Sequence, residues 1–107
     1  MDADLSKQLL NALQQAEAKF RALGDAPIYS SYSSGPAIAK VLRASAQQLE
    51  IGHVDLATQR ELWLIFAPTC DWDDVIGDVD LGNKIFALIN ILFGDGHREG
   101  YWSREAP

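Results

Sequence analysis

The segment that most constrains the fold of this 107-residue chain is 61–93, ELWLIFAPTCDWDDVIGDVDLGNKIFALINILF. Two apolar runs, at 62–67 and 85–93, lie on either side of a turn at 69–80 that holds five aspartates, one tryptophan and no basic residue. A run that is apolar on nearly all sides is usually buried. We therefore expect both runs at the centre of the fold, with the acidic turn between them.

The spacing of apolar residues predicts four main helices, at 4–23, 36–51, 55–67 and 80–93. Capping residues and helix breakers support these limits. Starts are predicted at Asp4, at Ser33 or Ser34, at Asp55 and at Asp78 or Asp80, and stops at Gly24, Gly52, Pro68 and Gly94. A strand at 62–66 is the competing interpretation of the third helix. We predict a compact all-α bundle in one domain, 1–107, whose third and fourth helices are the most buried, followed from 94 to 107 by a polar tail.

The charge balance narrows the classes of partner. Fifteen acidic residues against nine basic ones give a formal net charge of −6. Such a chain repels phosphate backbones and anionic membranes and favours basic partners. We therefore expect neither nucleic-acid nor membrane binding. No apolar run approaches the ~18–20 residues of a membrane span, the N-terminus lacks the features of a signal peptide, and Cys70 is the only cysteine. These features favour a cytoplasmic protein.

The sequence contains no arrangement typical of a catalytic site. His53 and His97 share no HxxH or HExxH spacing, and the chain has no GxSxG motif and no phosphate-binding glycine loop. Cys70 is followed by acidic residues, which raise the pKa of a thiol rather than activate it. We therefore expect a protein that is not an enzyme and needs no cofactor.

The acidic turn offers oxygen ligands of the kind that Ca²⁺ and Mg²⁺ prefer. An EF-hand loop counted from Asp71 fails, because Val75, Ile76 and Gly82 stand where an acid, a glycine and a glutamate are needed. A divalent-metal or ligand-binding module that uses the aspartates of 71–80 remains the alternative function.

Two interpretations of the acidic turn stay open. In the first, several aspartates cap the last helix and Trp72 fills the gap between helices. In the second, the adjacent acids Asp73 and Asp74, with Trp72, form a surface for a basic protein, because aromatic residues supply buried area and carboxylates supply steering and pairing. The full set of candidate partner-binding residues is Trp72, Asp73, Asp74, Asp71, Asp78, Tyr101 and Trp102.

A small, acidic, cysteine-poor chain without catalytic motifs resembles the bacterial immunity proteins that neutralise toxins of interbacterial secretion systems. The segment LWLIFAPTCDWDD is also similar to a family of uncharacterised small bacterial proteins. The immunity class has no shared motif, so no residue role follows from it. The resemblance implies an inhibitor that covers the basic active site of a toxin with an acidic surface. A homo-oligomer packed through apolar helices is a further possibility.

Overall fold

A computed structural model describes residues 2–28, 30–68 and 70–94. These residues form five helices and no strand: α1 (Ala3–Arg21), α2 (Gly35–Ile51), α3 (Leu56–Phe66), α4 (Asp71–Val75) and α5 (Val79–Phe93). The prediction of an all-α bundle is confirmed. The competing strand at 62–66 is wrong, because the helix that starts after Asp55 continues without a break to Phe66.

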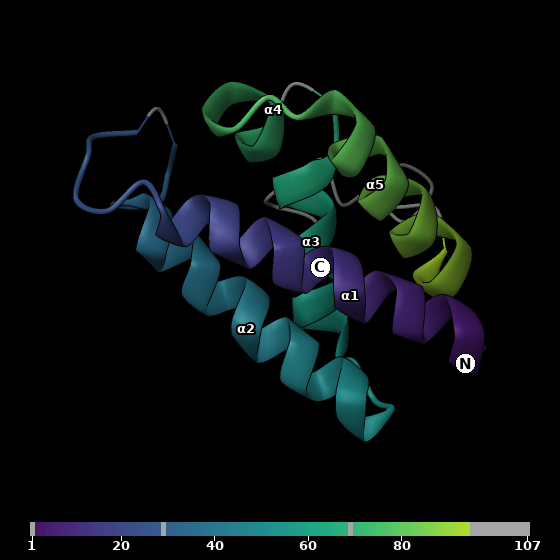
Figure 1. Ribbon diagram of the computed structural model, residues 1–107. Coiled ribbons are helices and arrows are strands. Elements are labelled where there is room, and N and C mark those ends of the chain that lie inside the picture. The colour runs from purple at the N-terminus through teal and green to yellow at the C-terminus, as the bar shows by residue number, and fades with distance from the viewer. Residues whose placement is uncertain (1, 29, 69, 95–107) are drawn as a thin grey trace.

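The helices pack around one core (Figure 1). α1 and α2 run antiparallel to each other, and α5 packs on α1 from the other side. α3 contacts α2 and α5, and α4 bridges the ends of α3 and α5. The acidic segment that contains α4 is therefore held by two neighbours rather than looped out into solvent.

Capping side chains set the helix limits much as predicted. Ser34 accepts a hydrogen bond from the N–H of Ala37 at 3.3 Å, and α2 ends at Gly52, whose φ of +88° is a left-handed conformation that favours glycine. Asp2, rather than Asp4, caps α1, because its carboxylate accepts from two backbone N–H groups at 3.0 Å.

Asp55 caps α3 as predicted, and its carboxylate accepts the Thr58 N–H at 2.8 Å. That backbone hydrogen bond, followed by the Thr58 hydroxyl, holds the pKa of Asp55 below its usual value of 3.8. The side chain of Gln48 adds a third contact at 3.2 Å, which ties the end of α2 to the start of α3.

The two apolar runs differ in their burial. In the run at 62–67 only Leu64 is half-buried and the others are buried, as predicted. In the run at 85–93 only one face is buried, and Ile91 is 64% exposed, so the expectation of all-round burial is wrong there. The expectation that the third and fourth main helices dominate the core is also wrong, because α1 and α2 supply more buried residues than α5 does.

Candidate functional site

The excess negative charge of the chain is concentrated in one short segment. Residues 71–80 carry five aspartates and no basic residue, a net charge of −5 out of −6 for the whole chain. In the structure this segment is not a single turn. It forms α4, a short connection, and the start of α5, so its carboxylates point in different environments and have different neighbours.

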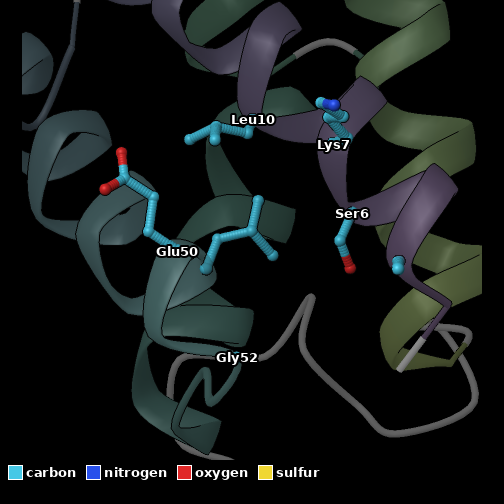
Figure 2. Close-up of a pocket in the computed structure, with 7 residues that line it drawn as sticks. Ser6, Lys7, Leu10, Glu50 and Gly52 are labelled. Atoms are coloured by element: carbon cyan, nitrogen blue, oxygen red, sulfur yellow. The ribbon is translucent and has the colours of Figure 1, made fainter.

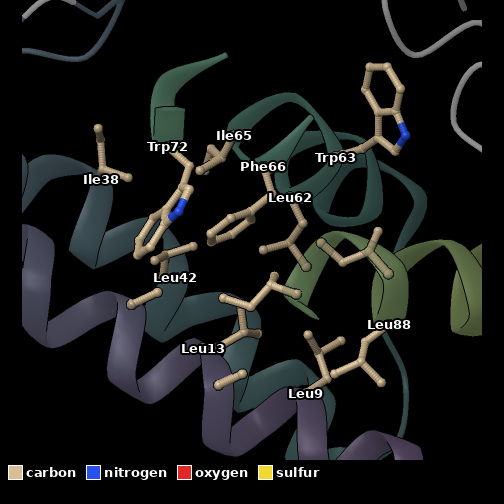
Figure 3. Close-up of a cluster of buried hydrophobic side chains, with 14 of the residues drawn as sticks. Leu9, Leu13, Ile38, Leu42, Leu62, Trp63, Ile65, Phe66, Trp72 and Leu88 are labelled. Atoms are coloured by element: carbon tan, nitrogen blue, oxygen red, sulfur yellow. The ribbon is translucent and has the colours of Figure 1, made fainter. Parts of the chain in front are cut away.

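Trp72 belongs to the core. Its side chain is fully buried, and its ring lies 5.5 Å from that of Phe20 at 78° and 5.4 Å from that of Phe66 at 41°. Figure 3 shows the indole of Trp72 among Ile38, Leu42 and Phe66. The prediction that Trp72 offers area to a partner is therefore wrong, and the alternative that it fills the gap between helices is confirmed.

The backbone of α5 closes over the Trp72 ring. Gly82 lies so close that an added Cβ would stand 2.4 Å from two atoms of the indole. The indole N–H donates to the carbonyl of Asp78 at 2.7 Å. A glycine that weakens the helix pattern in the sequence is therefore the residue that lets α5 pack against α4.

Asp78 is mainly a structural residue. Its carboxylate accepts the Leu81 N–H at 3.2 Å and so caps α5, as one of the two predicted caps. The same carboxylate lies 3.6 Å from the ammonium of Lys19 on α1, in an ion pair whose two side chains are 38% and 46% exposed. Its role as a partner-binding residue competes with these contacts.

Asp71 connects α4 to the segment that leads into α2. The Ser30 hydroxyl donates to the Asp71 carboxylate at 2.7 Å and accepts the Tyr32 N–H at 3.1 Å. The Tyr32 hydroxyl in turn donates to the carboxylate of Glu61 on α3. This network was missed at the sequence level, because its members are 29 and 41 residues apart and carry no shared motif.

Asp73 and Asp74 differ from the other acids of the segment in that both are exposed on α4. The sequence predicted little gain for adjacent acids at one helix terminus. The structure shows that they lie in the first turn of α4 itself, where the helix dipole favours negative charge. Asp80 is also exposed, in the first turn of α5.

Tyr101 and Trp102, the remaining candidates, lie outside the described residues. Within 2–28, 30–68 and 70–94, no group of three His, Cys, Asp or Glu side chains is placed to hold a metal ion. In the same part of the chain, no helix combines the length and apolarity that crossing a membrane requires.

Comparisons with known proteins add no relative to this picture. No protein-family model, curated protein or solved structure matches the chain. The functional argument therefore depends on the residues and on their arrangement.

Proposed function

We propose that the protein is a binding inhibitor of the immunity type, which neutralises a basic toxin or effector enzyme in the bacterial cytoplasm. The single observation that supports this is the exposed pair Asp73 and Asp74 on α4, here called the acidic surface. It lies in a segment that holds nearly all of the net charge of the chain.

The acidic surface is presented rigidly. A helix of five residues has little stability of its own, but Trp72 anchors α4 in the core and Ser30 contacts its first residue. A surface that is already ordered loses less conformational entropy on binding than a flexible loop would. Two adjacent carboxylates held in this way suit arginine and lysine side chains that line a cleft.

The burial of Trp72 changes the expected energetics. Without a tryptophan at the interface, the acidic surface acts mainly by steering and by pairing with cations, which raises association rates more than it slows dissociation. A toxin that handles phosphorylated substrates has a basic site, and an acidic plug would compete with such substrates. Asp71 and Asp78 add to the negative field, while Tyr101 and Trp102 stay predictions for the edge of the interface.

Capture followed by an inhibition assay tests the proposal. The wild-type chain, D73K/D74K and the control D4K/D25K serve as baits for the product of the neighbouring gene or for a lysate of the source cells. Asp4 and Asp25 are exposed, and both double variants change the net charge equally. We expect the wild type and the control to retain and inhibit one basic enzyme, and D73K/D74K to lose it. Equal capture and inhibition by all three would overturn the assignment of the surface.

A further inference from the structure

A groove of about 610 Å³ runs between the first turns of α1 and the last turn of α2 (Figure 2). Leu10 and Leu49 supply its apolar part. Lys7 from α1 and Glu50 from α2 line opposite sides, as Figure 2 shows. Among the described residues, neither of these two charged side chains is in an ion pair.

A large apolar side chain stands beside the groove. Ile51 is 81% exposed, and it lies between Glu50 and Gly52, both of which line the groove. A groove and a projecting aliphatic side chain that share one edge can serve as socket and knob for two copies of the same surface. A groove for an unrelated peptide does not require such a knob on its rim.

The charges have the same self-complementary arrangement. In a two-fold symmetric interface, a contact of residue i with residue j of the partner occurs twice. With the axis beside Ile51, the Lys7 ammonium of each copy would meet the Glu50 carboxylate of the other. We propose that this face of α1 and α2 binds a second copy of the chain, with each Ile51 inserted in the other's groove and two reciprocal Lys7–Glu50 pairs at the rim.

The dimer face is separate from the acidic surface. Trp72 anchors α4 against Phe20, near the end of α1, whereas Lys7 of the groove lies 13 residues earlier on the same helix. At 1.5 Å per residue, that separation is roughly 20 Å along the helix axis. A dimer formed in this way leaves both acidic surfaces accessible, so the inference goes beyond the proposed function and does not depend on it.

A reciprocal charge exchange tests the proposal by sedimentation equilibrium of the full chain. We expect a wild-type dimer, at least about tenfold weaker association in K7E and in E50K, and recovery in K7E/E50K. I51D should be monomeric, and circular dichroism should show that each variant is folded. D73K/D74K should form dimers as the wild type does, which separates this test from that of the proposed function.

Three results would overturn the dimer. The first is a wild-type chain that is monomeric up to about 1 mM. The second is a K7E/E50K variant that associates no better than either single variant. The third is a folded monomer in which I51D abolishes capture of another protein, because the groove would then belong to that partner.

Discussion

Substituting Gly82 with alanine tests the packing that positions the acidic segment. Judged from the sequence alone, G82A should stabilise α5, since alanine is favoured over glycine in a helix by about 1 kcal/mol. In the structure the new Cβ would lie 2.4 Å from the Cδ1 and Nε1 atoms of Trp72. Ordinary contact begins at 3.4 Å, so the ring or the helix must move by about 1 Å.

The net effect is destabilising. Trp72 is fully buried and packed on two aromatic rings, so it cannot move aside without disturbing them. Overpacking of a core costs about 1–3 kcal/mol, and loss of the buried hydrogen bond from the indole to Asp78 adds about 1–3 kcal/mol. After subtraction of the helix-propensity gain we expect a loss of about 2 kcal/mol. For a chain of this size, that lowers the Tm by roughly 10 °C.

Urea denaturation and calorimetry measure this effect directly. N83A, at an exposed position of the same helix, is the matched control and should be neutral or slightly stabilising. W72F, with a smaller ring, should be destabilising alone, but W72F/G82A should be more stable than the sum of the two single effects by about 1 kcal/mol. A G82A variant as stable as the wild type would refute the claim that α5 is locked against Trp72.

Three further substitutions test the contacts around the site. D78A should lower the free energy of unfolding by about 1 kcal/mol, whereas D78N, which keeps the oxygen that accepts the Leu81 N–H, should lose little; equal losses in denaturant titrations would contradict the capping role. S30A should cost about 1 kcal/mol because it leaves the Asp71 carboxylate without the hydroxyl donor, and a loss no larger than that of S31A would argue against this contact. The lowered pKa of Asp55 stabilises the fold at neutral pH, and this contribution is lost as the pH falls from the usual value of 3.8 through the lower value of the folded state. D55N should therefore show a smaller loss of stability below pH 4 in acid titrations followed by circular dichroism, and an unchanged profile would contradict the assignment.

Local sequence signals predicted most of the helices. The caps at Ser34 and Asp55 and the stop at Gly52 act through hydrogen bonds within a few residues, so they are visible in the sequence. α4 was missed because five residues are too few to show a helical period. Its formation depends on the burial of Trp72, which is a tertiary effect.

The position of Trp72 could not be decided from its neighbours. A tryptophan among aspartates fits a binding surface and a core plug equally well, and the deciding residue, Gly82, is ten positions away. A glycine inside an apolar helix was the available signal, since it often marks a close approach. The groove was also hidden, because its two walls come from segments about 40 residues apart.

The measurement that tests the central claim most directly is the rate of association with the captured partner as a function of salt concentration. The wild type and D4K/D25K should associate rapidly at low salt, with rates that fall steeply as salt screens the charges. D73K/D74K should associate at least about tenfold more slowly at low salt and show a flatter salt dependence. Equal rates and equal salt dependence for D73K/D74K and the wild type would contradict the account.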